Sequence, residues 1–111
     1  MSPENVLLSW DGRVYVADFG VAKFSGAELK TQSGVVKGKF AYMSPEQTEA
    51  KPLDRRSDVF ALGIVLHESL TGRPLFDGRS IAETVHRIFT LEPPNPAELR
   101  DDVPAALGEL V

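Results

Sequence analysis

Several features are scarce or absent in this chain of 111 residues, and each absence excludes a class of function. There is no cysteine, which excludes disulfide bonds, thiolate catalysis and cysteine-ligated zinc. The two histidines, His67 and His86, lie too far apart for a local metal-binding motif, and we expect both to be ordinary helix residues. There is no basic excess. The net charge is −4, which argues against a nucleic-acid-binding protein, because basic surfaces neutralise phosphates.

Long apolar runs are also absent. The longest, Val59–Leu66, is far shorter than the roughly 20 residues that cross a bilayer. The N-terminus lacks the basic, apolar and small-residue succession of a signal peptide. We therefore expect a cytoplasmic protein without a membrane segment. The remaining composition, 42% hydrophobic and 25% charged, is typical of a soluble globular protein, and the length fits one small domain or part of a larger one.

The N-terminal part of the sequence predicts a β-hairpin. Residues 6–8 (Val-Leu-Leu) and 14–17 (Val-Tyr-Val-Ala) have the composition of short strands. The turn at 10–13 contains an Asp-Gly pair, a strong hairpin signal because glycine adopts the positive φ that a tight turn requires. From Asp18 to Lys39 no period is sustained, so we expect a long irregular segment, which in a compact domain usually has a function.

Helices are predicted for most of the remaining chain. A short helix is expected at Ser44–Gln47, where the serine can cap the helix, proline follows it and the glutamine can close a capping box. A longer helix is expected from a cap at Ser57 to about Leu70, with Thr71 and Gly72 as the stop.

Another helix is predicted over residues 80–90. Ser80 and Glu83 form a second capping box. One face of this helix is apolar and consists of Ile81, Val85, Ile88 and Phe89. The proline-rich residues 92–96 predict a loop, and a last helix is expected to begin near Pro104.

The predicted helix over 57–70 is apolar on every face between residues 59 and 66. Such a helix must be surrounded by protein, because a surface helix has a polar side. Gly63 costs about 1 kcal/mol relative to alanine in a helix interior, which is tolerable where another segment packs closely against the backbone. One hairpin and a few short helices offer it little cover. We therefore expect that packing partners are missing, and self-association through the uncovered helix is one expected consequence.

Four motifs lie in order along the chain: Ser-Pro-Glu-Asn at 2–5, Ala-Asp-Phe-Gly at 17–20, Gly-Lys-Phe-Ala-Tyr-Met-Ser-Pro-Glu-Gln at 38–47 and Ser-Asp-Val-Phe-Ala-Leu-Gly at 57–63. The Asp-Phe-Gly alone is a weak signal, because glycine after aspartate often marks only a strand end. Together the four motifs resemble the protein kinase family over essentially the whole chain. Within that family they are most similar to bacterial serine/threonine kinases. The resemblance implies a mostly α fold with one β-hairpin, a part of the C-terminal lobe of a two-lobed α+β parent.

The resemblance implies a site for ATP and Mg²⁺. Asp18 would bind the Mg²⁺ that bridges the ATP phosphates, and Asn5 would hold the second metal ion. Without the other motifs, Asn5 would equally suit the start of a turn and Asp18 the end of a strand. Leu7 would form the apolar floor beneath adenine, and Ala17 would be the small residue before the aspartate, although both could also be plain hairpin core.

Four further positions receive roles from the resemblance. Thr31 and Ser33 lie where activation-loop phosphorylation would occur, although any loop hydroxyl fits that description. Glu46 would pair with a distant arginine, and Asp58 would bond the backbone of the catalytic loop, so both are predicted to be structural.

The chain also departs from the family pattern. The catalytic base belongs to a His-Arg-Asp immediately before the position of Met1, and the arginine that would pair with Glu46 would lie beyond Val111. The glycine-rich loop, the ATP-anchoring lysine and its glutamate partner would also precede Met1. Removing the base alone costs roughly 10²–10⁴-fold in rate, so we expect no kinase activity from these residues alone. We expect the codons just upstream to encode His-Arg-Asp.

A further departure involves Ser2 and Lys39. Serine/threonine kinases usually carry lysine where this chain has Ser2, and threonine where it has Lys39. An ammonium group on a flexible stem can reach one point from several anchor positions. Lys39 is therefore a candidate to supply phosphate-facing charge, with the hydroxyl role passed to Ser2. The alternative is that Lys39 is a solvated loop lysine.

The sequence thus predicts a partial protein kinase domain over 1–111. Its parts are the catalytic-loop tail and hairpin (1–17), the activation segment (18–46), the central helix (57–72), the amphipathic helix (80–90) and the start of another helix (104–111). The predicted function is ATP-dependent phosphorylation of serine or threonine in protein substrates, with no nucleic-acid or membrane partner. Two alternatives stay open: a pseudokinase-like binding or scaffold module without catalysis, and a non-functional fragment.

Overall fold

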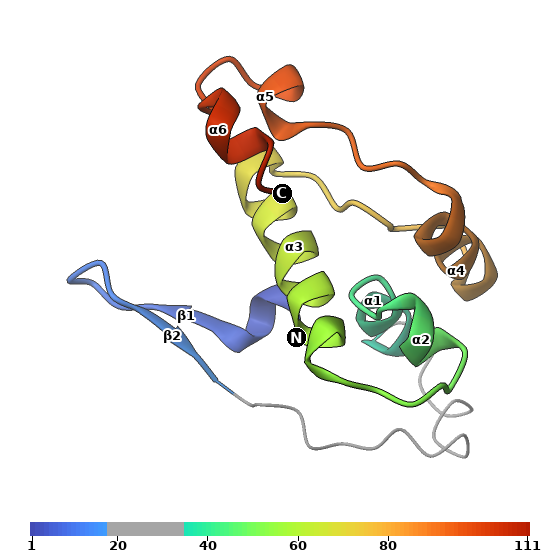
Figure 1. Ribbon diagram of the computed structural model, residues 1–111. Coiled ribbons are helices and arrows are strands. Elements are labelled where there is room, and N and C mark those ends of the chain that lie inside the picture. Colours follow the sequence, from blue (N-terminus) through green and yellow to red (C-terminus); the bar gives the residue numbers. More distant parts are fainter. Residues whose placement is uncertain (18–34) are drawn as a thin grey trace.

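A β-hairpin is followed by a series of helices of very different lengths (Figure 1). The computed structural model describes residues 1–17 and 35–111. The elements are the 3-10 helix η1 (Pro3–Asn5), the strands β1 (Val6–Leu8) and β2 (Val14–Val16), and the helices α1 (Val35–Phe40), α2 (Pro45–Thr48), α3 (Arg55–Thr71), α4 (Ile81–Thr90), α5 (Pro96–Leu99) and α6 (Ala105–Gly108). The described chain is mostly helical with one two-stranded antiparallel hairpin, which confirms the predicted fold class.

The hairpin has the predicted turn. Leu7 of β1 pairs with Tyr15 of β2 in antiparallel register. Between the strands, Gly12 has a φ of +80°, a conformation that glycine adopts without steric cost. The Ser9 N–H closes the turn by donating to the Arg13 carbonyl at 2.9 Å. The hairpin extends away from the helices in Figure 1, so most of its side chains are exposed.

The expectation of an irregular segment up to Lys39 is wrong at its carboxyl end, where residues 35–40 form α1. Gly38 lowers the helix propensity of this short segment. The burial of Phe40 and Ala41 anchors the helix end, and α1 contacts α4. Tertiary packing, which the local pattern does not encode, therefore decides the structure here.

The capping box predicted for α2 is present. Ser44 Oγ accepts from the Gln47 N–H at 3.4 Å, and Gln47 Oε1 accepts from the Ser44 N–H at 2.9 Å. Ser44 is fully buried, so this reciprocal pairing replaces the water that its polar groups lose.

Helix α3 begins before its predicted cap. Asp54 is the N-cap, because its carboxylate accepts from the Arg56 N–H at 2.9 Å. Ser57 therefore lies inside the first turn. The predicted stop is confirmed, since Gly72 has a φ of +68° and its N–H donates to the Glu68 carbonyl at 2.7 Å. Although α3 has 17 residues and an apolar centre, none of the described helices is long and apolar enough to cross a membrane.

Helix α4 follows Ser80 as predicted, and Ser80 Oγ accepts from the Glu83 N–H at 3.2 Å. The second half of the predicted capping box differs. The Glu83 carboxylate accepts from the Arg79 N–H at 2.8 Å, one residue ahead of the predicted donor. The hydrogen bonds at the start of this helix therefore reach one residue further into the preceding loop than those of a capping box.

The predicted apolar face of α4 is only partly buried. Ile88 is buried together with Thr84, whereas Ile81 and Phe89 are exposed. Beyond α4, the four-residue helix α5 begins at the last residue of the predicted proline-rich loop. The last helix, α6, is a single turn that starts directly after Pro104.

The hydrophobic core lies against one side of α3. Ile64 of α3 packs with Phe76 and Ile88. Three partly buried side chains border this cluster: Tyr42, Phe60 and Leu75. The rings of Phe60 and Phe76 are stacked with their centroids 6.1 Å apart. The core thus joins α3 to α4 and to the loop between them.

The other side of α3 is uncovered. Val59 is 68% exposed and Leu62 is 49% exposed, which agrees with the expectation that this helix lacks part of its cover. Among the described residues no segment packs closely against Gly63, because a Cβ built there would meet no atom within 4 Å.

His67 lies within α3, which agrees with its prediction as a helix residue. It is buried, and its Nε2 lies 2.9 Å from the Pro94 carbonyl oxygen. Because a carbonyl oxygen only accepts, Nε2 carries the proton and donates. The histidine holds the proline-rich loop against α3.

Candidate active site

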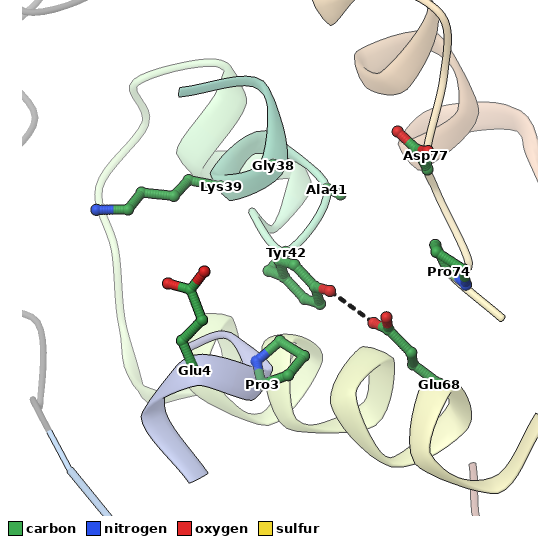
Figure 2. Close-up of a pocket in the computed structure, with 9 residues that line it drawn as sticks. All are labelled: Pro3, Glu4, Gly38, Lys39, Ala41, Tyr42, Glu68, Pro74 and Asp77. Carbon is green, nitrogen blue, oxygen red and sulfur yellow. Dashed lines mark hydrogen bonds between the residues drawn. The ribbon is translucent and has the colours of Figure 1, made fainter. Parts of the chain in front are cut away.

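A cavity of about 450 Å³ lies where the N-terminal turn meets the helices. Its lining comes from residues 3–4 of η1, from residues 38–39 and 41–42 at the end of α1, from Glu68 of α3, and from the loop residues Pro74 and Asp77 (Figure 2). These segments are distant in the sequence. The cavity therefore depends on the packing of η1 and the α1 region beside α3.

One hydrogen bond spans part of the cavity wall. The Tyr42 hydroxyl donates to Glu68 Oε2 at 2.6 Å (Figure 2). Burial raises the pKa of Tyr42, and the hydrogen bond to Glu68 and the negative charges of Glu68, Glu4 and Asp77 raise it further. Tyr42 therefore remains protonated, and a hydrogen-bond donor, at neutral pH.

The cavity carries more negative than positive charge. Its lining includes three carboxylates, Glu4, Glu68 and Asp77, and one ammonium group, that of Lys39. Such a surface favours cationic groups over anionic ones. The described residues contain no group of three His, Cys, Asp or Glu side chains that could hold a metal ion.

Asn5 lies at the junction of η1 and β1. Its carbonyl oxygen accepts from the Ala17 N–H at 2.7 Å, which fixes Asn5 opposite the residue that precedes Asp18. Its own N–H donates to the Ser2 carbonyl at 2.9 Å. The side-chain Oδ1 of Asn5 accepts from the Ser2 N–H at 2.9 Å and from the Ser2 hydroxyl at 3.0 Å.

The chemistry of Asn5 fits a magnesium ligand. Mg²⁺ prefers hard oxygen ligands, and an amide oxygen is one. The N–H and the carbonyl of Asn5 both form hydrogen bonds, so the backbone position from which its side chain extends is fixed. The predicted partner, Asp18, lies outside the described residues, as do the predicted phosphorylation sites Thr31 and Ser33. Their roles stay predictions.

The two residues predicted for the adenine pocket share one face of the hairpin. Leu7 pairs with Tyr15, and Ala17 lies two residues beyond Tyr15, on the same face by strand alternation. Leu7 is 52% exposed, and its role in an adenine pocket stays a prediction. This face of the hairpin is accessible to a ligand or to another part of a protein.

Lys39 is exposed on α1 and helps to line the cavity. Its side chain extends away from the Tyr42–Glu68 hydrogen bond (Figure 2). In the part of the chain that the structure describes, its ammonium group has no ion-pair partner. Ser2, its predicted counterpart, has its hydroxyl bonded to Asn5.

Glu46 and Asp58, both predicted to be structural, have different environments. Glu46 Oε1 accepts from the hydroxyl of the buried Ser57 at 2.5 Å, which joins α2 to α3. This hydrogen bond is the main cause that holds the pKa of Glu46 below its ordinary value. Asp58 is exposed, and within residues 1–17 and 35–111 its side chain has no hydrogen-bond partner. Its contact with a catalytic loop stays a prediction.

The pair formed by Tyr42 and Glu68 was not predicted from the sequence. The two residues are 26 positions apart, so no local pattern joins them. Tyr42 belongs to the motif at 38–47, and Glu68 follows the motif at 57–63 on the same helix. The available signal was that Tyr42 belongs to one motif and Glu68 follows another on the same helix, but this does not show which side chains meet.

Comparison with known proteins shows to which family this chain belongs. Residues 1–106 match the protein kinase domain. The tyrosine-protein kinase MasK of Myxococcus xanthus is 43% identical over the whole chain, and the serine/threonine-protein kinase PknL of Mycobacterium tuberculosis is 39% identical over the whole chain. The probable serine/threonine-protein kinase PkwA of Thermomonospora curvata is 48% identical over 91% of the chain.

The chain belongs to the protein kinase family. This confirms the resemblance that the four motifs indicate. The chain spans 17% of the length of MasK, 28% of PknL and 13% of PkwA. The structure therefore corresponds to a minor part of each of these relatives.

Proposed function

We propose that this chain is part of a serine/threonine protein kinase that transfers the γ-phosphate of ATP to hydroxyl groups of protein substrates in the cytoplasm. The observation that carries the proposal is the match of residues 1–106 to the protein kinase domain. Asn5 supports it, because its backbone pairs with Ala17, the residue directly before Asp18. That pairing suits two oxygen ligands that act together.

Phosphoryl transfer depends mostly on positioning and on the neutralisation of charge. Asn5 and Asp18 would hold Mg²⁺, which when bound neutralises charge on the ATP phosphates. Asn5 contributes a neutral oxygen whose backbone is held by Ser2 and Ala17. Leu7 and Ala17 would present the open face of the hairpin to adenine. Leu7 and its partner Tyr15 are exposed, which leaves this face accessible to a flat ring.

Lys39 supplies the phosphate-facing positive charge in this proposal. Its side chain is long, flexible and exposed, and it has no ion-pair partner among the described residues. Ser2 cannot supply that charge, and its hydroxyl is already bonded to Asn5. Thr31 and Ser33 remain the candidates for phosphorylation that activates the protein.

The cavity beside α3 is the proposed contact for the substrate polypeptide. Glu4 and Glu68 contribute carboxylates from two different segments, so a basic side chain near the target hydroxyl would be bound between them. The Tyr42 hydroxyl fixes one of these carboxylates through its hydrogen bond to Glu68.

A second candidate function is that of a pseudokinase-like binding module. The observation that favours it is the state of Asn5 Oδ1, because both acceptor positions of this oxygen are used by Ser2. In this conformation no lone pair is open to a metal ion. A module that keeps this conformation would bind protein partners without transferring phosphate.

Both candidates are tested in a chimera in which residues 1–111 replace the matching segment of PknL, which is 39% identical over the whole chain. The chimera is incubated with γ-³²P-labelled ATP and a basic protein substrate, and the phosphoamino acids are separated after acid hydrolysis. We expect label in phosphoserine and phosphothreonine. Unmodified PknL is the positive control, and the chimera with Asn5→Ala and Asp18→Ala is the negative control.

The outcomes separate the candidates. Label in phosphotyrosine alone would give this segment the specificity named for MasK and reject the serine/threonine proposal. A folded chimera that binds the substrate but transfers no label would favour the binding module.

A further inference from the structure

The Ser2 side chain is bonded to the atom of Asn5 that a metal ion would need. The Ser2 hydroxyl donates to Asn5 Oδ1 at 3.0 Å, and the Ser2 N–H donates to the same oxygen at 2.9 Å. An amide oxygen has two lone pairs. Both acceptor positions of Oδ1 are therefore filled by one residue.

The two hydrogen bonds differ in how readily they break. The Ser2 N–H belongs to a backbone that is held in place, because the Ser2 carbonyl accepts from the Asn5 N–H at 2.9 Å. The Asn5 carbonyl is held in turn by the Ala17 N–H. The Ser2 hydroxyl, in contrast, can rotate about its C–O bond and turn to another acceptor. Only the hydroxyl bond is exchangeable without moving the backbone.

We propose that Ser2 is a positioning residue that competes with Mg²⁺ for Asn5 Oδ1 and thereby sets how tightly Asn5 binds the metal ion. The proposal rests on the proposed function, in which Asn5 is a metal ligand. With the hydroxyl turned toward Oδ1, the oxygen has no open lone pair. With the hydroxyl turned away, one lone pair is open, and the Ser2 N–H still holds the amide in its orientation.

The size of the effect follows from the strength of one hydrogen bond. A single neutral hydrogen bond in a protein changes an equilibrium constant by about two- to tenfold. Neither a serine hydroxyl nor an asparagine amide titrates near neutral pH, so the competition should not depend on pH there. Removal of the hydroxyl should therefore strengthen metal binding by that factor at any neutral pH.

The test is a titration of the ¹⁵N-labelled full chain with Mn²⁺, followed through the paramagnetic broadening of the Asn5 backbone and side-chain amide signals. Ser2→Ala should lower the Mn²⁺ concentration of half-maximal broadening by about two- to tenfold. Ser2→Thr keeps the hydroxyl and should stay within about twofold of the unmodified chain. The same variants in the PknL chimera, followed by the Mg²⁺-induced rise in melting temperature, provide a second measurement that does not depend on the isolated chain.

Each result supports or overturns the proposal. If Ser2→Ala binds Mn²⁺ as the unmodified chain does, or more weakly, the competition is overturned. If Asn5→Ala weakens binding in the same experiment, the proposed role of Asn5 as a ligand stands even so. If Asn5→Ala leaves binding unchanged, Asn5 is not a ligand, and both the competition and the proposed metal site are overturned.

Discussion

The Ser57 hydroxyl donates a hydrogen bond of 2.5 Å to Glu46 Oε1, and this contact joins the first turn of α3 to α2. Ser57 is 5% exposed, so its hydroxyl has little access to water and depends on this acceptor. Glu46 is the glutamate of the Ser-Pro-Glu motif. Its carboxylate therefore has a partner in the described chain, in addition to the arginine that the family resemblance implies.

Ser57→Ala should lower the free energy of unfolding and weaken its dependence on acid pH. The folded pKa of Glu46 lies below its ordinary value, chiefly because Ser57 donates to the carboxylate. A lowered pKa contributes stability that is present above the unfolded value of about 4.3 and is lost as pH falls through the folded pKa. Urea unfolding between pH 3 and pH 7 should show a smaller acid loss in Ser57→Ala than in the unmodified chain.

The matched control for this prediction is Ser69→Ala. Ser69 lies on the same helix, but its hydroxyl donates to the Val65 carbonyl and contacts no carboxylate. Ser69→Ala should therefore leave the acid dependence of the unfolding free energy unchanged. Identical acid profiles for Ser57→Ala and the unmodified chain would show that the hydrogen bond to Glu46 does not contribute to stability.

Two glycine-to-alanine substitutions should change stability in opposite directions. At Gly78, a Cβ would lie 2.6 Å from the backbone nitrogen of Thr84, so Gly78→Ala should destabilise the chain by about 1–3 kcal/mol. At Gly63 of α3, a Cβ would meet no described atom within 4 Å, so Gly63→Ala should stabilise it by up to about 1 kcal/mol. Midpoints of urea unfolding measure both. A stabilising Gly78→Ala would show that the start of α4 is not packed as described.

Local signals in the sequence predicted the elements that depend on local chemistry. The Ser44–Gln47 capping box and the Gly72 stop involve residues only a few positions apart, so the sequence carries all the information they need. Helix α1 was missed because the burial of Phe40 comes from packing between distant segments. The cap of α3 was misassigned to Ser57, whereas the residue that caps the helix is Asp54, three positions earlier.

In the candidate site, too, the residues that belong to a motif were predicted, whereas their side-chain partners were not. Asn5 was predicted through its motif, but its hydrogen bonds to Ser2 were not, because the choice of side-chain partner is made in three dimensions. The Tyr42–Glu68 pair joins segments 26 residues apart, so it could not be predicted without the packing of α3.

The uncovered side of α3 should make the isolated chain self-associate. Val59 and Leu62 are exposed apolar residues on one side of this helix, and exposed apolar surface promotes association and dye binding. Sedimentation velocity should show oligomers, and ANS fluorescence should rise. Val59→Lys combined with Leu62→Lys should reduce both effects.

Glu109→Lys, a charge reversal at an exposed site outside α3, is the control for the added positive charge and should leave association unchanged. A monomeric unmodified chain that binds no ANS would contradict the prediction.

The role of Lys39 can be measured in the PknL chimera. If its ammonium group faces phosphate mainly in the transition state, Lys39→Ala should lower kcat by about tenfold or more with little change in the KM for ATP. Ser2→Lys, added to Lys39→Ala, should restore part of the rate. Lys51→Ala is the control, because Lys51 is exposed and pairs with Glu49. Unchanged turnover in Lys39→Ala would leave Lys39 as a solvated lysine.

Asn5 is proposed to hold the metal ion of a kinase site, and the Mg²⁺ dependence of phosphoryl transfer by the PknL chimera tests this role most directly. Transfer from γ-³²P-labelled ATP is measured across Mg²⁺ concentrations for the chimera and for its Asn5→Ala variant, with Asn95→Ala, at the N-cap of α5, as an asparagine control. We predict that Asn5→Ala raises the half-maximal Mg²⁺ concentration by at least about tenfold, whereas Asn95→Ala leaves it unchanged. An Asn5→Ala variant with the Mg²⁺ dependence of the unmodified chimera would contradict the account.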